Sequence, residues 1–129
     1  SISDFQGALG VSILFNMDEH MNIRERNASI LEIELSTLKN VNTIQKEPGT
    51  SRVHYIRYPI LIGNGKRDKV LNEFLKHGIE ANVTYPEVKP DANKFPGAAK
   101  VSEEILTLPC HPGVNEEDLR AIIQIIKKF

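Results

Sequence analysis

The spacing of apolar residues changes once along this chain, and this change limits the possible folds more than any other feature. From residue 5 to residue 38 apolar side chains recur at helical spacing, whereas residues 53–62 form a dense run of β-branched, aromatic and aliphatic side chains. That run stops at Gly63-Asn64-Gly65, a turn signal. A chain of 129 residues suits one domain of such mixed content. We therefore predict an α+β fold in which a small antiparallel or mixed sheet packs on helices.

The front of the chain is predicted to be a long helical arm. A first helix covers residues 3–15, and a second, amphipathic helix begins at Asp18. Gly7 and Gly10 lower the helix propensity of the first helix, so we expect them to mark close packing. The apolar stripe of the second helix consists of Met17, Met21, Ala28, Leu31, Leu35 and Leu38.

Strand and helix signals alternate over the rest of the chain. Pro59, inside the predicted strand 53–62, indicates an edge position or a bulge. A helix over 66–77 ends before Gly78, and a strand over 79–84 is expected to follow it. The apolar face of this helix is predicted to be Val70, Leu71, Phe74 and Leu75. The other predicted segments are a connection over 40–52 with a short extended piece, a loop over 86–94, a helix over 96–104, a strand over 105–108 and a helix capped by Asn115. We divide the chain into a helical connecting or interface arm, 1–40, and an α+β portion, 41–129, within one structural unit.

Charge and composition exclude several classes of function. Sixteen basic against 17 acidic residues give a net charge of −1, which argues against nucleic acid and anionic membranes as partners. The apolar stretch 8–15 is too short to span a membrane. The single cysteine, Cys110, cannot form an intramolecular disulfide and favours a reducing, cytoplasmic location. Cys110-His111 does not have the spacing of a zinc site, so no metal is expected.

Two segments are candidate binding surfaces. Asn82, Thr84 and Tyr85 place polar and aromatic groups where the predicted strand runs into a loop, a common location for binding residues. The alternative is an ordinary strand exit with Tyr85 partly packed. In the first helix, Phe5, Leu9 and Ile13 offer more apolar surface than one side of a small domain covers, which indicates an interface. The alternative is that this helix folds back onto the core. Catalytic motifs are absent, and Gly63-Asn64-Gly65-Lys66 lacks the spacing of a phosphate loop.

Several short motifs follow one another along nearly the whole chain: Ser3–Gly10, Asp18, Arg24-Glu25-Arg26-Asn27, Tyr58-Pro59-Ile60, Arg67-Asp68 with Leu71 and Leu75, Gly78-Ile79, Tyr85-Pro86, Ala98-Ala99, Glu104–Pro109, His111-Pro112 and Glu117-Asp118. In their order and spacing, these motifs resemble the C-terminal region of the DegT/DnrJ/StrS-type sugar aminotransferases.

This resemblance implies the small domain of a fold-type-I enzyme that moves an amino group to a keto sugar, usually nucleotide-linked. Such enzymes hold pyridoxal phosphate (PLP) as a Schiff base on a lysine of a large domain, which is expected to precede Ser1 in a homodimeric enzyme. None of the ten lysines here has a matching context. The chain alone is therefore expected to bind no cofactor and to be inactive, and it contributes Asn82, Thr84 and Tyr85 to the substrate pocket.

The sequence departs from the family pattern at two positions. The family often has an arginine where Ser1 stands and a histidine where Thr84 stands. A neutral hydroxyl cannot replace a titrating imidazole, whereas Tyr85 can still stack on a sugar or donate to it. Two other hypotheses stay open: a stand-alone, non-catalytic assembly module derived from this domain, which associates through its front helix, and a regulatory domain that binds a small ligand.

Overall fold

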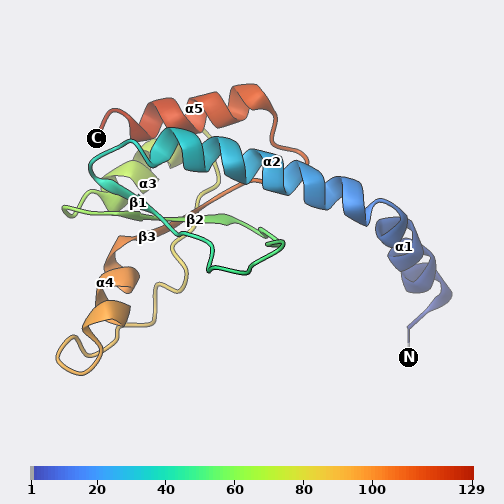
Figure 1. The fold of residues 1–129 in the computed structure, drawn as a ribbon, viewed down its shortest axis with the longest axis horizontal. Helices are drawn as coiled ribbons and strands as arrows, with labels where there is room; N and C mark the ends of the chain where they lie inside the picture. Colours follow the sequence, from blue (N-terminus) through green and yellow to red (C-terminus); the bar gives the residue numbers. More distant parts are fainter. Residues whose placement is uncertain (1) are drawn as a thin grey trace.

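The computed structural model describes residues 2–129, which form five helices and one three-stranded sheet (Figure 1). The elements in chain order are α1 (Asp4–Phe15), α2 (Met17–Leu35), β1 (Val41–Thr43), β2 (Tyr58–Ile62), α3 (Arg67–Lys76), α4 (Pro96–Glu104), β3 (Ile105–Leu108) and α5 (Glu116–Ile126). The predicted α+β class is confirmed, and the sheet is antiparallel throughout. The expectation about Ser1 lies outside the described residues.

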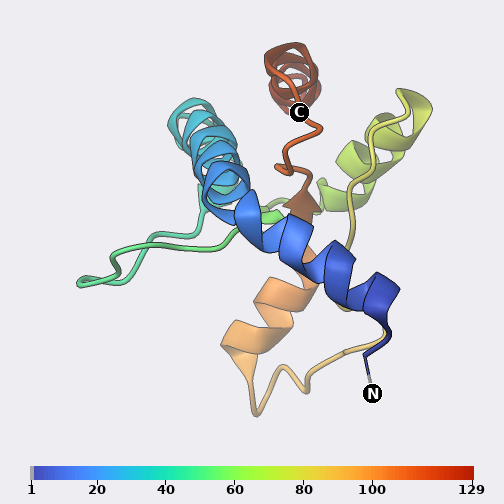
Figure 2. The ribbon, with the colours of Figure 1, turned by 90° about the vertical axis from the view of Figure 1, so that its right-hand side faces the viewer.

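The sheet separates two unequal layers. Its order is β1-β2-β3, and along β2 the buried Tyr58, Ile60 and Ile62 alternate with the half-buried Pro59 and Leu61. Helices α2, α3 and α5 cover the face to which the buried residues point, while α4 lies on the other side of the sheet (Figures 1 and 2). The second face is therefore covered less completely than the first.

The core lies between this sheet and the helices α2 and α5. Only the C-terminal half of the predicted α2 stripe is buried, because Ala28, Leu31 and Leu35 are at most 1% exposed while Met17 is 46% exposed. Helix α5 is capped by Asn115 as predicted, through a capping box in which Asn115 and Asp118 bond to each other's main chain. Its buried face consists of Leu119, Ile122, Ile123, Ile125 and Ile126.

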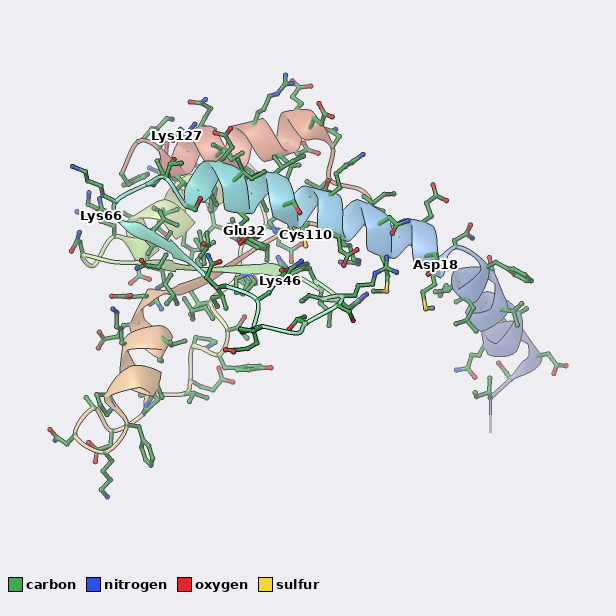
Figure 3. All side chains as sticks on the ribbon, viewed as in Figure 1. Asp18, Glu32, Lys46, Lys66, Cys110 and Lys127 are labelled. Atoms are coloured by element: carbon green, nitrogen blue, oxygen red, sulfur yellow. The ribbon has the colours of Figure 1, made fainter. Side chains whose placement is uncertain are left out.

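A buried amide joins α2 to the segment before α5. The Asn27 side chain is fully buried, and its Nδ2 donates to the carbonyl oxygens of Cys110 at 3.2 Å, His111 at 3.4 Å and Val114 at 3.1 Å. Figure 3 shows Cys110 between α2 and the sheet. Since buried carbonyls need partners, Asn27 fixes the irregular segment 110–114 onto α2.

The strand predicted over 53–62 is shorter than expected and begins at Tyr58. Arg24 on α2 explains the difference, because its Nη1 donates to the carbonyl oxygens of Tyr55 at 2.9 Å and Ile56 at 3.0 Å. A side chain thus takes the place of a neighbouring strand for this stretch of main chain.

The edge position predicted for Pro59 is wrong, because β2 is the central strand. Pro59 pairs with Thr107, whose own N–H and C=O bond to Asn82 on the other side, so the Pro59 nitrogen points away from β3. Strand β1 ends at Thr43, opposite Ile60, and no longer runs beside Pro59. The missing N–H of Pro59 therefore costs no ladder bond.

The strand predicted over 79–84 is also wrong, since only Asn82 pairs there, in an isolated bridge with Thr107. The Ile79 N–H closes α3 instead: it donates to the Phe74 carbonyl at 2.9 Å, next to Gly78, which has φ +69°. The predicted apolar face of α3 is correct for Val70 and Phe74, whereas Leu75 is turned to solvent and is 60% exposed.

Helix α1 extends away from the rest of the molecule (Figure 1). Its start is capped as predicted, by Ser3 and Gln6, but the helix contains no buried residue. The expectation that Gly7 and Gly10 mark close packing is not met within this chain, because an added Cβ at either position would meet no atom within 4 Å. The alternative in which this helix folds back onto the core is wrong.

Candidate substrate-binding site

The segment that carries the predicted site residues is attached to the free edge of β3. Asn82 N donates to Thr107 O at 3.1 Å and Thr107 N donates to Asn82 O at 2.8 Å. The Thr107 hydroxyl adds a third bond to Asn82 O at 3.0 Å. Three bonds at one residue fix the point at which the chain leaves the sheet, so Thr84 and Tyr85 begin a loop from a rigid anchor.

Arg57 is a neighbour of this anchor that sequence reasoning missed. Its Nη1 donates to Glu80 Oε1 at 3.2 Å and its Nη2 donates to Glu80 O at 2.9 Å. When the Asn82 amide is oriented to satisfy both of its groups, its oxygen accepts from Arg57 Nη1 at 3.2 Å and its nitrogen donates to Ala81 O at 3.1 Å. Arg57 therefore orients the Asn82 side chain. Arg57 lies directly before the strand Tyr58–Ile62, which pairs with Thr107. This position is the sequence signal that could have identified Arg57 as a neighbour of the site.

Thr84 and Tyr85 differ in exposure. Thr84 is half-buried, whereas Tyr85 is 67% exposed. The alternative in which Tyr85 is partly packed at a strand exit therefore does not describe the structure. An exposed phenol can stack on an apolar ring face and can donate or accept a hydrogen bond.

A cavity of about 540 Å³ lies beside this loop. Val83 and Pro86 contribute to its wall, whereas Asn82, Thr84 and Tyr85 are not among its lining residues. Its size is within the usual range for small-molecule sites. The remaining lining residues come from the start of α3, the later part of the loop, and α4: Arg67, Asp68, Lys89, Pro90, Ala92, Ala99, Ser102 and Glu103.

The predicted interface residues form a separate surface. Phe5, Leu9 and Ile13 are 79%, 52% and 53% exposed, all on α1. Helix α1 and the loop after Asn82 lie at opposite ends of the molecule (Figure 1). The structure thus brings Asn82, Thr84 and Tyr85 together and keeps them apart from α1.

Other chemistry-bearing groups do not form a second centre among residues 2–129. No group of three or more His, Cys, Asp or Glu side chains is arranged to hold a metal ion in this part of the chain. The Cys110 thiol is buried, and burial raises its pKa, so it stays protonated at neutral pH. Across the described residues, no helix has the length and apolar character that crossing a membrane requires.

Comparison with known proteins identifies relatives over nearly the whole chain. GDP-perosamine synthase from Caulobacter vibrioides is 29% identical over 132 aligned positions, which cover 95% of this chain and 36% of the relative. A DegT DnrJ EryC1 StrS aminotransferase structure from Brucella abortus has a TM-score of 0.79 with 26% identity, covering 96% of this chain and 35% of the other.

Sugar aminotransferase CalS13 from Micromonospora echinospora shares the fold at a TM-score of 0.80, with 21% identity over 95% of this chain and 34% of its own. The chain therefore spans about a third of the length of the relatives that it matches. The profile of the DegT/DnrJ/EryC1/StrS aminotransferase family matches residues 1–127. Because this match extends over nearly every residue, the chain belongs to that family.

Proposed function

We propose that this chain is the C-terminal, small-domain portion of a PLP-dependent aminotransferase that acts on a keto sugar, most commonly a nucleotide-linked one, in the cytoplasm. The family match and the similarity to a GDP-perosamine synthase support the reaction class. One observation carries the proposal. The loop that starts from the rigid Asn82 anchor presents an exposed aromatic ring and hydroxyl groups, at Thr84 and Tyr85, that are available to a sugar.

The lysines of the described chain do not fit a Schiff-base cofactor, which needs an enclosed lysine beside a phosphate cradle. Among residues 2–129 Lys66 is less exposed than the other lysines, and its Nζ donates to the Phe129 carbonyl. Figure 3 places Lys66 and Lys127 at the end of the molecule remote from α1, and Lys127 pairs with Glu34 at 2.9 Å. A Streptococcus pneumoniae relative in fold has been solved in a PLP-form and a PMP-form. We therefore assign the cofactor to a large domain outside this chain.

In the proposed enzyme, Asn82, Thr84 and Tyr85 contact the sugar, and α1 contributes to the interface with the large domain and the second subunit of a homodimer. Thr84 supplies a neutral hydroxyl that binds without exchanging a proton at physiological pH. The role of α1 is supported by its exposed Phe5, Leu9 and Ile13, because a helix that is apolar all round is normally buried.

A chimera tests this function. The matching third of the Caulobacter GDP-perosamine synthase is exchanged for this chain, and amino transfer to the keto sugar is measured. We expect activity in the chimera, a higher KM in Tyr85→Ala, and no change in Leu75→Ala, a control on α3 whose side chain is similarly exposed. A chimera that folds and binds PLP but transfers no amino group would contradict the proposal.

The isolated chain provides an independent check on the cofactor assignment. After the chain is mixed with PLP and passed through gel filtration, no lysine-bound chromophore should remain. A chromophore that survives this step would place the Schiff base on a lysine of this chain and overturn the assignment.

The exposed α1 also favours a second candidate, a stand-alone assembly module that associates through Phe5, Leu9 and Ile13. This candidate requires a defined dimer of the isolated chain, measured by sedimentation. It also requires that Leu9→Asp with Ile13→Asp give a folded monomer. A wild-type chain that is already monomeric would contradict it and favour the aminotransferase portion.

A further inference from the structure

In the loop that carries Tyr85, Val83 packs against the core, but the large side chains beyond it are exposed. We define the Tyr85 loop as residues 83–95; its large side chains Tyr85, Val88 and Phe95 are 67%, 50% and 60% exposed. The cavity of about 540 Å³ lies between this loop and α4, so the space behind the loop is open as well. A segment with so little buried surface takes its shape from its hydrogen bonds.

A series of three hydrogen bonds connects Tyr85 to the start of α3. Val88 N donates to Tyr85 O at 3.1 Å, which closes a turn directly after the aromatic residue. Ser102 Oγ, on α4, donates to Val88 O at 2.7 Å. Arg67 Nη1 donates to Ser102 O at 2.8 Å. The turn that presents Tyr85 is therefore bonded to α4, and α4 is bonded to α3.

The guanidinium of Arg67 is itself held in place. Its Nε donates to Asp68 Oδ1 at 2.8 Å, and the arginine side chain is only 18% exposed. An arginine can bond to a carboxylate and a carbonyl at the same time through separate nitrogens, whereas a lysine has a single nitrogen for both. This double bonding gives the adjacent pair Arg67-Asp68 a physical function that does not require contact with any ligand.

We propose that Arg67 and Ser102 are positioning residues that fix the Tyr85 loop in the orientation used for sugar binding. This inference rests on the proposed function. Ser102 acts through the Val88 carbonyl, and Arg67 acts through Ser102. Asp68 supports the arginine. The proposal thus assigns loop orientation to residues on two helices outside the loop.

The first test uses the chain itself and needs no activity. Because the chain contains no tryptophan, Tyr85→Trp introduces a single tryptophan at the loop, which can be excited without exciting the remaining tyrosines. In this background Ser102→Ala and Arg67→Gln should lower the fluorescence anisotropy. In the unaltered background the same changes should speed hydrogen exchange at the Val88 amide about fivefold, the equivalent of one lost hydrogen bond of about 1 kcal/mol.

A matched control separates loop orientation from general loss of stability. Ser36→Ala removes a serine hydroxyl that donates to the Ile33 carbonyl at 3.2 Å at the end of α2, and it should leave both readouts unchanged. Arg67→Lys keeps the charge and should restore the Val88 exchange rate only in part. Unchanged anisotropy and unchanged Val88 exchange in both Ser102→Ala and Arg67→Gln would overturn the inference.

The second test uses the active chimera. Ser102→Ala and Arg67→Gln should raise the KM for the keto sugar about fivefold while kcat changes less, because a misplaced loop weakens binding before it affects the chemical step. An unchanged KM in both variants would overturn the sugar-binding role. If the chimera without these changes is inactive, the proposed function fails, while the exchange and anisotropy measurements still decide whether these residues position the loop.

Discussion

Asn27 fixes the conformation of the irregular segment 110–114. Its buried amide nitrogen bonds to three carbonyl groups of this segment. Asn27→Ala removes the donor of the Cys110 and Val114 carbonyls, whereas His111 O keeps its bond from Val114 N at 2.9 Å, and it should lower the free energy of unfolding by about 2 to 3 kcal/mol. Urea denaturation measures this value. Asn22→Ala, at an exposed position on the same helix, is the matched control and should cost less than about 0.5 kcal/mol. Equal costs at the two positions would refute this role of Asn27.

Tyr58 shows the opposite situation, a buried hydroxyl that makes no hydrogen bond of normal geometry among residues 2–129, although the Thr43 side chain lies near enough to act on its pKa. Burial, followed by the charge of Glu32, raises the pKa of Tyr58 above its ordinary value of 10.0. The neutral phenol is thus favoured by folding, so its stabilising contribution is complete below pH 10 and is lost as the pH rises further.

Removing this hydroxyl therefore has a defined pH signature. Tyr58→Phe should raise the free energy of unfolding at neutral pH by about 1 kcal/mol, since an unsatisfied polar group is removed. Above pH 10 the variant should lose stability less steeply than the wild type. Denaturant titrations at a series of pH values measure both effects. Tyr85→Phe, at an exposed position, should leave the neutral-pH value unchanged, and a destabilised Tyr58→Phe would show that the hydroxyl has a partner.

At the scale of elements, two helices with the same kind of cap have different surroundings. Asn115 caps α5, which is buried along one face, whereas Ser3 caps α1, which has no buried residue. Asn115→Ala should lower the free energy of unfolding by about 1 kcal/mol. Ser3→Ala should leave that free energy unchanged and reduce only the helix content measured by circular dichroism. A loss of global stability in Ser3→Ala would show that α1 packs on the core.

Elements with strong local signals were predictable from sequence, and those decided by distant residues were not. Pro96, Pro109 and the Asn115 cap mark the limits of α4, β3 and α5, which the structure confirms. The start of β2 depends on Arg24, more than thirty residues earlier, binding main-chain carbonyls. Carbonyl acceptors have no sequence signature, because every residue has one.

The same reason limits how much of the candidate site could be predicted from the sequence. The loop over 86–94 was predictable from sequence, but its start directly after Asn82 was not, because the strand expected over 79–84 is reduced to one bridge at Asn82. The bonds from Arg67 to Ser102 O and from Ser102 to Val88 O join segments distant in sequence through main-chain oxygens, so only the fold reveals them. Whether Asn82, Thr84 and Tyr85 bind a sugar stays a prediction.

For the molecule as a whole, the burial of α2 sets how much of the arm can be removed. A chain of residues 17–129 loses only α1, which contributes nothing to the core, and should unfold cooperatively with an unchanged melting temperature. A chain of residues 41–129 also loses Ala28, Leu31 and Leu35, and should not fold. Thermal unfolding of both chains tests the predicted division at residue 40. A stable 41–129 chain would support an independent α+β portion.

The pairing of α2 with α5 and the segment before it also determines the order in which this protein can fold during its synthesis. Asn27 bonds to Cys110 and Glu34 pairs with Lys127, so α2 must wait for partners that lie 83 and 93 positions later in the chain. Until α5 leaves the ribosome, the apolar side of α2 has no permanent cover. Such a chain has an extended period in which molecular chaperones can bind it, and slower translation between α2 and α5 would prolong that period.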